Sequence, residues 1–332
     1  MLVFFFLPFG FARAQVDAGS FGDNLSLSAS PQYSHPGDIV HVSLQGVSSG
    51  FDPSSITWYV GPKKLTQATA ASAIDIVAPA LGAETSVTAQ VAGGGSANIV
   101  IRPSELDLLW ESDSYVPLSY RGRALPSAGS MIRLEAEPRF KRANGAMVAN
   151  KNIIFTWRRG PLVMQSVSGL GKSSVSVAAP TLFGTDTISV EAHSADGTIG
   201  NTATVRIASV EPKLVMYQDD PLTGVSYFKA FGANEDIQDA EVTLQAVPYY
   251  LAGSPKDAAL QYDWSLNGGI VRTNTAHPDE ITVNAAGADG IIAQIHLALT
   301  SASDMFLSAA GDWNVSFSHA GTSGGANPFT AK

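Results

Sequence analysis

Short alternating runs of hydrophobic and polar residues recur along this chain in a fixed order. "DIVHVSLQG", ending at Gly46, is followed by "SITWYVG" around Trp58. The same order returns as "MIRLEAEP" and "IIFTWRRG" around Trp157, and as "AEVTLQAVP" and "LQYDWSLNGG" around Trp264. Alternation with a period of two is typical of β-strands that bury one face. The pattern therefore predicts one series of strands, repeated three times.

The residues after each Trp continue the repetition. "IDIVAPALG", "VSVAAPTLFG" and "ITVNAAGADG" each precede another alternating strand, and "ANIVIRP", "TATVRIAS" and "DWNVSFS" close the three units. A half-buried strand needs a second sheet to cover its apolar face. The pattern thus predicts an antiparallel two-sheet sandwich of immunoglobulin type, with a buried Trp on the third strand. A barrel or a propeller would predict shorter units, of roughly 40 to 50 residues for a propeller blade.

The predicted fold class is all-β, a tandem array of three immunoglobulin-like antiparallel β-sandwich domains. We place the domains at residues 15–104, 105–210 and 211–332. Residues 1–14, "MLVFFFLPFGFARA", are predicted to be a signal peptide, because an apolar stretch ends in the small-x-small triplet Ala12-Arg13-Ala14. The apolar stretch is too short to span a bilayer, and no later segment qualifies as a transmembrane helix.

Composition agrees with exported sandwiches that fold without covalent cross-links. Hydrophobic residues make up 45% of the 332 residues, charged residues only 15%, and cysteine is absent. Packing alone must hold the domains, and thiolate metal sites are excluded. The net charge of −9 is the sum of −3, +2 and −9 over the three domains in order and +1 from Arg13 in residues 1–14. Nucleic-acid binding calls for a strongly basic face, which this chain lacks.

Two similar stretches follow the closing strands of the first two units: "LLWESDSYVPLSYRGRALPS" at 108–127 and "LVMYQDDPLTGVSYFKAFGA" at 214–233. Each is predicted to open the next domain, with a Pro that breaks the strand so that it changes sheet or lies at an edge. We expect Trp110 and Tyr217 between domains, and the nearby bases to pair with Asp113 or Asp220. The joint candidates are Trp110, Asp113, Pro117, Tyr120, Arg121, Tyr217, Asp220, Pro221, Tyr227 and Lys229. The alternative is a ligand groove lined by Tyr115, Tyr120 and Arg121.

The middle unit alone carries clustered bases around its Trp strand: Arg139, Lys141, Arg142, Arg158 and Arg159. They are either solvated loop ends or a contact for an acidic partner, such as a cell-wall polymer or another subunit.

Motifs for enzymatic chemistry are weak. "SVSGLGKSS" at 166–174 lacks the first Gly of a P-loop and leads into a strand, so a turn is expected there. The six His residues show no ligand spacing, and no Gly-x-Ser-x-Gly elbow occurs. No cofactor is predicted. Calcium at the joints, bound by Asp107, Glu111, Asp113, Glu211, Asp219 and Asp220, is the alternative to solvated acidic turns.

The Trp strand followed by a strand ending in "SADG" is similar to PKD-like repeats of bacterial surface proteins. "DLLWESDSYVPLSYRGRAL", "FTWRRG" and "VMYQDDPLTGVSYFKA" resemble more closely a group of uncharacterised exported proteins of candidate-phylum bacteria. None of the three Trp is followed by Phe-Gly-Asp-Gly, so the chain departs from proper PKD repeats. The resemblance implies an exported array of immunoglobulin-like domains and no particular chemistry.

We therefore expect a non-enzymatic spacer or interaction protein at the cell envelope. Its predicted location is extracytoplasmic: secreted, periplasmic or on the cell surface. An envelope protein or a cell-wall polymer is the predicted partner. A carbohydrate- or cell-wall-binding module is the alternative function, and an enzyme comes third.

Overall fold

The computed structural model describes residues 25–46, 56–65, 71–92, 95–272, 274–285 and 291–318, and the predicted signal peptide, 1–14, lies outside this part of the chain. The described residues form β-strands and two short 3₁₀ turns, Asn150–Asn152 and Gln165–Val167. Within these ranges, no helix is long and apolar enough to cross a membrane. The strands form six sheets, two in each of the three repeats. The predicted class, a tandem array of immunoglobulin-like β-sandwiches, is confirmed.

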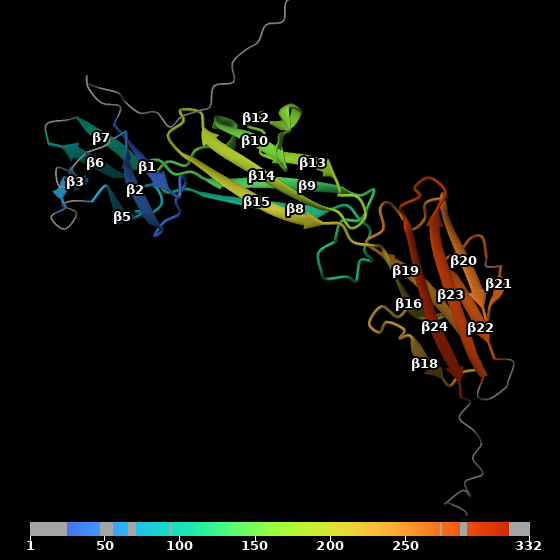
Figure 1. The fold of residues 1–332 in the computed structure, drawn as a ribbon. Helices are drawn as coiled ribbons and strands as arrows, with labels where there is room; N and C mark the ends of the chain where they lie inside the picture. The colour runs from blue at the N-terminus through green and yellow to red at the C-terminus, as the bar shows by residue number, and fades with distance from the viewer. Residues whose placement is uncertain are drawn as a thin grey trace, which may run out of the picture. The chain divides into compact units, whose positions relative to one another are not determined.

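The first repeat packs a three-stranded sheet, in the order β1-β2-β5, against a four-stranded sheet, β4-β3-β6-β7 (Figure 1). Val40, Val42 and Ile76 of one sheet share a core with Trp58 and Val87 of the other. The strands are β1 Ser26–Ser30, β2 Ile39–Gln45, β3 Ile56–Val60, β4 Lys63–Lys64, β5 Ala73–Val77, β6 Thr85–Val91 and β7 Ser96–Ile101.

The middle repeat has one sheet in the order β13-β9-β8 and another in the order β11-β10-β14-β15, with β12 also paired to β10. In β9 and β10 buried and outward positions alternate, as the sequence pattern requires. The strands are β8 Glu105–Ser112, β9 Met131–Arg139, β10 Ile153–Arg159, β11 Leu162–Val163, β12 Gly169–Leu170, β13 Ser174–Ala178, β14 Thr185–Ser194 and β15 Gly200–Ala208. Gly169 and Leu170 pair with β10, which gives the Gly-rich stretch a structural role.

The third repeat packs the sheet β17-β16-β19-β22 against the sheet β18-β24-β23-β20-β21. Met216, Leu244 and Ile281 of the first sheet share a core with Trp264 and Val315 of the second. The strands are β16 Lys213–Asp220, β17 Gly224–Val225, β18 Asn234–Ile237, β19 Glu241–Tyr249, β20 Leu260–Leu266, β21 Gly269–Val271, β22 Glu280–Asn284, β23 Ile291–Ser301 and β24 Ser308–Phe317. β18 pairs with β24 in parallel, in contrast to the other strand pairs of this repeat.

The three core tryptophans occupy equivalent places in their repeats. Trp58, Trp157 and Trp264 lie on β3, β10 and β20, with exposed fractions of 0%, 0% and 2%. Each indole Nε1 donates to a backbone carbonyl 13 to 15 residues later: Ala71 at 2.9 Å, Lys172 at 2.8 Å and Pro278 at 2.8 Å. The same partly buried hydrogen bond therefore ties the Trp strand to the following segment in all three repeats.

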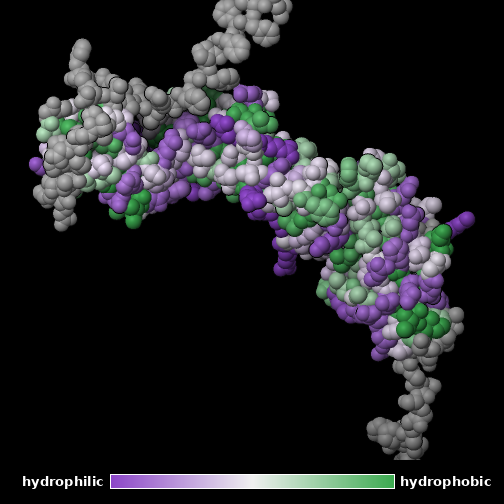
Figure 2. All heavy atoms as spheres, viewed as in Figure 1, coloured by the Kyte–Doolittle hydropathy of each residue, from purple (hydrophilic) through white to green (hydrophobic). Residues whose placement is uncertain are grey.

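By its contacts the chain divides into two compact units. One contains the residues up to 109, with 135–175 and 187–205; the other contains 110–134, 176–186 and the residues from 206 onward. Each unit thus combines a terminal repeat with part of the middle one. On the face in view, hydrophobic side chains lie in separate patches among hydrophilic ones, as expected where alternating strands turn their polar positions outward (Figure 2).

Candidate functional site

The segment after β8 contacts the third repeat, within the second unit. Tyr115 N donates to Leu251 O at 2.7 Å, and Tyr250 N donates to Tyr115 O at 2.7 Å, so the two segments form an antiparallel bridge. The Tyr115 side chain packs against a small core formed by Leu251, Leu299 and Leu307. This part of the first stretch, 108–127, is therefore a joint between the second and third repeats.

A network of tyrosines extends this joint. The Tyr120 ring lies edge-on to Tyr249 and Tyr250, with centroids 5.5 and 6.1 Å away, and its hydroxyl is 2.8 Å from that of Tyr250. Tyr217 continues the network, because its hydroxyl is 2.7 Å from that of Tyr249. Tyr120 comes from the second repeat and the other three from the third. Edge-to-face rings and paired hydroxyls give the joint defined geometry as well as apolar contact.

The same contacts raise tyrosine pKa values. The hydrogen bond between the Tyr250 and Tyr120 hydroxyls, followed by burial, raises the pKa of Tyr250 to about 12. Burial, followed by the charge of Asp279, raises the pKa values of Tyr115 and Tyr262. All three tyrosines are therefore held in their neutral, hydrogen-bonding form.

The local sequence shapes the loop that carries these tyrosines. Pro117 is buried in a turn closed by Tyr120 N donating to Pro117 O at 2.9 Å. Asp113 accepts from Met131 N at 2.7 Å, which ties the start of the loop to β9. A Cβ at Gly122 would collide with the Tyr120 hydroxyl, so the residue under this ring must be small.

Trp110 and the two arginines of the stretch have other surroundings. Trp110 is half-buried on β8, and the Arg123 guanidinium lies 4.5 Å from its ring centroid. Arg121 is exposed. Asp113 was expected to form an ion pair with a nearby base. Instead, Asp113 accepts from the Met131 amide, and Arg123 contacts the ring of Trp110.

The second stretch, 214–233, is built differently from the first. Pro221 lies in the turn between β16 and β17, where Asp220 accepts from the amides of Leu222 and Thr223, both at 2.9 Å. Tyr217 is 5% exposed and contacts Tyr227 as well as Tyr249, both in its own repeat.

After β17 the chain crosses to the other sheet of the third repeat, where it forms β18. Lys229 pairs with Glu235 at 3.2 Å during this crossing, instead of with Asp220. The change of sheet expected at a Pro break thus takes place after the turn that contains Pro221, whereas the corresponding part of the first stretch contacts the third repeat.

The junction of the first and second repeats lies within the first unit, next to the boundary expected after residue 104, but the contacts that form it were not predicted from the sequence. Ser104 is fully buried; its amide donates to Ser34 O at 3.1 Å and its hydroxyl to Gly200 O at 2.7 Å. Asn201, only 3% exposed, donates from Nδ2 to Ser104 O at 2.7 Å. The polar groups of the connecting segment are thus satisfied by residues of both repeats.

An aromatic contact accompanies these hydrogen bonds. Tyr33 of the first repeat donates to Glu191 at 3.0 Å and packs edge-on against His193, with centroids 5.6 Å apart. The hydrogen bond from His193, the larger favourable cause, and that from Tyr33 lower the pKa of Glu191 against the effect of its burial. No sequence motif marked these residues, which lie more than 150 positions apart.

Several of the predicted basic residues are engaged by carboxylates of the same unit. Arg139 pairs with Glu105 at 2.5 Å and Asp107 at 2.9 Å, and Arg142 pairs with Asp196 at 2.5 Å. Arg158 and Arg159 lie on β10 and pair with β11. The charge of Arg158 also helps to lower the pKa of Glu191, which lies on β14. Lys141 has no ion-pair partner within the described ranges.

The acids proposed for calcium have other partners where the structure gives them. Asp107 pairs with Arg139, Glu111 lies 3.8 Å from Arg133, and Asp220 caps its own turn. The described part of the chain contains no group of three or more His, Cys, Asp or Glu side chains placed to hold a metal ion.

No protein-family model matches the chain, and no curated protein matches it. Among solved structures, the three N-terminal domains of the Highly Immunogenic Outer Capsid protein of bacteriophage RB49 align at 13% identity and a TM-score of 0.25, covering 91% of this chain and 100% of that one. The central fibronectin-III array of RIM-binding protein aligns at 11% identity and a TM-score of 0.31, covering 86% and 93%. The Bacteroides ovatus SGBP-B protein, in complex with a mixed-linkage heptasaccharide, aligns at 11% identity and a TM-score of 0.23. The alignment covers 93% of this chain and 71% of that one. The fold assignment rests on the sheets and cores described above.

Proposed function

We propose that this chain is a non-enzymatic, exported cell-envelope protein whose immunoglobulin-like repeats serve as a spacer and interaction array. The observation that carries the proposal is the joint between the second and third repeats. There, Tyr115 forms a two-way backbone bridge with the segment at Leu251, and Tyr120 joins the tyrosines of the third repeat.

A spacer needs defined junctions, because inter-domain surfaces within a chain are modest and mobile by default. Here the junctions contain buried, satisfied backbone groups and aromatic contacts. At the junction between the first and second repeats, Ser104 and Asn201 have this role. The aromatic and acidic residues of the first stretch, 108–127, contact other parts of the protein. This favours a joint over a ligand groove at that position.

Paired spin labels test the stiffness of the joint. Ala208 and Gln261 are exposed strand residues of the second and third repeats, and cysteines placed there would be the only ones in the chain. Tyr120→Ala should broaden the distance distribution between the labels, because it removes two ring contacts and a hydroxyl pair. The matched control is Trp110→Ala, whose contact with Arg123 lies within the second repeat. A distribution that is equally narrow in wild type and Tyr120→Ala would contradict the spacer role.

The location is tested separately. Full-length chain and a variant lacking residues 1–14 should be expressed in a bacterial host and the cells fractionated. The proposal expects the full-length chain outside the cytoplasm and the truncated chain inside it. Cytoplasmic retention of both would refute the envelope location without affecting the test of the joint.

A further inference from the structure

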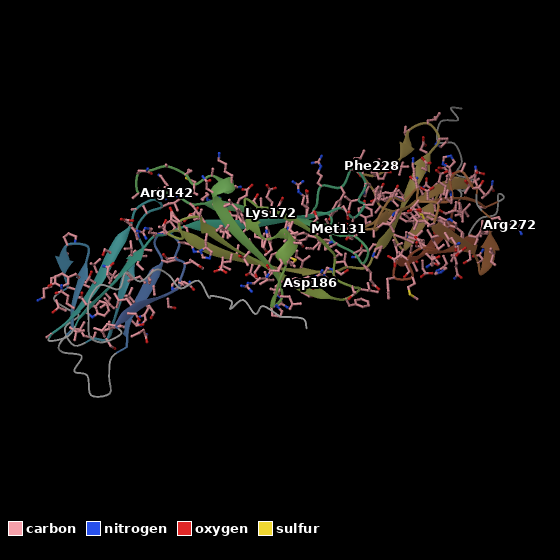
Figure 3. All side chains as sticks on the ribbon, turned by 90° about the horizontal axis from the view of Figure 1, so that it is seen from above. Met131, Arg142, Lys172, Asp186, Phe228 and Arg272 are labelled. Carbon is pink, nitrogen blue, oxygen red and sulfur yellow. The ribbon has the colours of Figure 1, made fainter. Side chains whose placement is uncertain are left out.

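A pocket lies where the first and second repeats meet, within the first unit. Its volume is about 340 Å³, at the lower end of the usual range for small-molecule sites. Gly82, Glu84 and Arg102 line it from the first repeat, and Lys141, Arg142 and Thr198 from the second. Arg142, labelled in Figure 3, lies at the end of the second repeat that meets the first.

The pocket is positively charged. Three bases and one acid line it, and the acid, Glu84, is bound by Arg102 at 2.8 Å. Arg142 is bound by Asp196 at 2.5 Å, while Lys141 has no ion pair within the described ranges. An anion in the pocket would therefore meet one uncompensated ammonium and a guanidinium whose planar fork still has donors to offer.

The cationic groups are held in place before any ligand arrives. Asp196 accepts from the Ser194 hydroxyl at 2.6 Å, and from the Thr198 hydroxyl at 2.7 Å and amide at 3.1 Å. These bonds, with that from Ser194 the largest cause, hold the pKa of Asp196 well below its usual range. Asp196 is therefore a fixed negative charge that orients both Arg142 and Thr198. Such preorganisation lowers the entropy cost of binding.

Lys141 is fixed by a close approach between the two repeats. Gly82 has a φ of +83°, and a Cβ there would lie 2.7 Å from Lys141 Cδ. Only glycine satisfies both the backbone conformation and the packing of the lysine stem. The stem of Lys141 thus contacts the first repeat where the two repeats line the pocket.

The lining indicates the chemistry of the ligand. It contains no aromatic side chain among its described residues, so a neutral sugar would lack a stacking surface. Among the described residues of the lining, Ile199 is the only large hydrophobic one and is itself 4% exposed, which leaves a peptide without an apolar anchor. Polar donors remain: Asn144 uses Oδ1 to accept from Ala146 N at 3.0 Å, which leaves its amide nitrogen for a ligand hydroxyl.

We propose that this pocket binds a saccharide that carries an oxyanion, a carboxylate or a phosphate, with Lys141 and Arg142 as the anion ligands. The inference rests on the proposed function in one respect: it takes the acidic saccharide to be part of an envelope polymer. It gives the interaction role a chemical class of ligand. Because the pocket bridges two repeats, a bound saccharide would also contact both sides of their junction.

Calorimetric titration of the full chain tests the proposal. The probes are a galacturonate trisaccharide, a matched neutral galactose trisaccharide, a sugar phosphate and triglutamate. We expect the galacturonate or the sugar phosphate to bind, with an affinity that falls as salt is added, and the neutral sugar not to bind. Which of the two anionic sugars binds more tightly distinguishes a carboxylate from a phosphate source.

Two variants and a control locate the site. Lys141→Met keeps the stem over Gly82 and removes the charge, and Arg142→Gln removes the guanidinium. Each should weaken binding about tenfold or more, the usual value of a hydrogen bond to a charged group. Lys172→Met removes an exposed charge elsewhere on the second repeat (Figure 3) and should leave the affinity unchanged.

The proposal fails if neither anionic sugar binds, if both pocket variants bind as wild type does, or if triglutamate binds more tightly than the sugars. Unchanged thermal unfolding of Lys141→Met, which alters a half-buried surface residue, would show that weaker binding is not a loss of fold. The binding data do not depend on the stiffness of the joint at Tyr120 or on the location of the protein in the cell, so the proposals can fail separately.

Discussion

Replacing Trp157 with phenylalanine removes the indole nitrogen whose hydrogen bond recurs in all three repeats, and so tests how much this bond contributes to stability. Trp157 is 0% exposed, and its Nε1 donates to Lys172 O at 2.8 Å. Phenylalanine keeps most of the ring volume but leaves that carbonyl without its partner. A hydrogen bond contributes about 0.5–1.5 kcal/mol net, and the smaller ring also gives up buried contacts, so Trp157→Phe should destabilise by at least about that amount. Trp157→Ala also opens a cavity and should cost about 3–5 kcal/mol.

The equivalent bonds of Trp58 and Trp264 give an internal comparison, because phenylalanine at either position should have a similar cost. Trp110→Phe is the control: this side chain is half-buried, and its contact with Arg123 is worth about 0.5–1 kcal/mol at an exposed site. Denaturant unfolding followed by circular dichroism, with hydrogen exchange to assign the transition to a repeat, measures the difference. If Trp157→Phe costs no more than Trp110→Phe, the equivalence of the three tryptophans has no energetic meaning and the reasoning is wrong.

Four further outcomes are expected. Asn201→Ala should destabilise the first junction by about 1–3 kcal/mol, because buried Ser104 O loses its partner; hydrogen exchange at Ser104 and its neighbours would show faster opening. Tyr250 should titrate near pH 12. Because its pKa is higher in the folded than in the unfolded state, its contribution to stability is present below about pH 10 and is lost as pH rises through 12. Tyr120→Phe should lower that pKa toward about 10, visible as earlier tyrosinate absorbance. Gly82→Ala should strain the left-handed turn and displace Lys141, weakening anionic-sugar binding while Lys172→Met does not.

The sequence by itself determined the sandwiches. Alternation along β2, β9 and β19 specifies which face of each strand is buried, because side chains on a strand alternate between its two faces. Recurrence of the same order around three tryptophans then requires the same solution three times. These are local signals, readable within a few residues. The division at residues 104 and 210 remains a prediction; the contacts group the chain into two units that share the middle repeat.

Only the tertiary structure decided what the two similar stretches do. In both, an apolar strand is followed by acids, a Pro and tyrosines, yet Tyr115 and Tyr120 contact the third repeat while Tyr217 remains in its own. The sequence contains the same residue types in both places, so pattern alone could not separate them. The difference depends on which surface lies opposite each loop. The adjacent tyrosines Tyr249 and Tyr250 were a visible signal for a contact surface, because buried tyrosine hydroxyls need hydrogen-bond partners.

The pocket shows even more clearly that a sequence pattern does not reveal which distant residues meet. Lys141 and Arg142 were recognisable as clustered bases, but Gly82, Arg102 and Thr198 lie 39 to 59 positions away from Lys141 and show no motif in common with it. Their meeting requires both repeats to be folded and in contact within the first unit. A strand pattern records burial of a face, whereas loops at the ends of a sandwich have no periodicity to read. The sequence therefore determined the strands and their buried faces, and the packing of one repeat on the next decided which loop residues form a site.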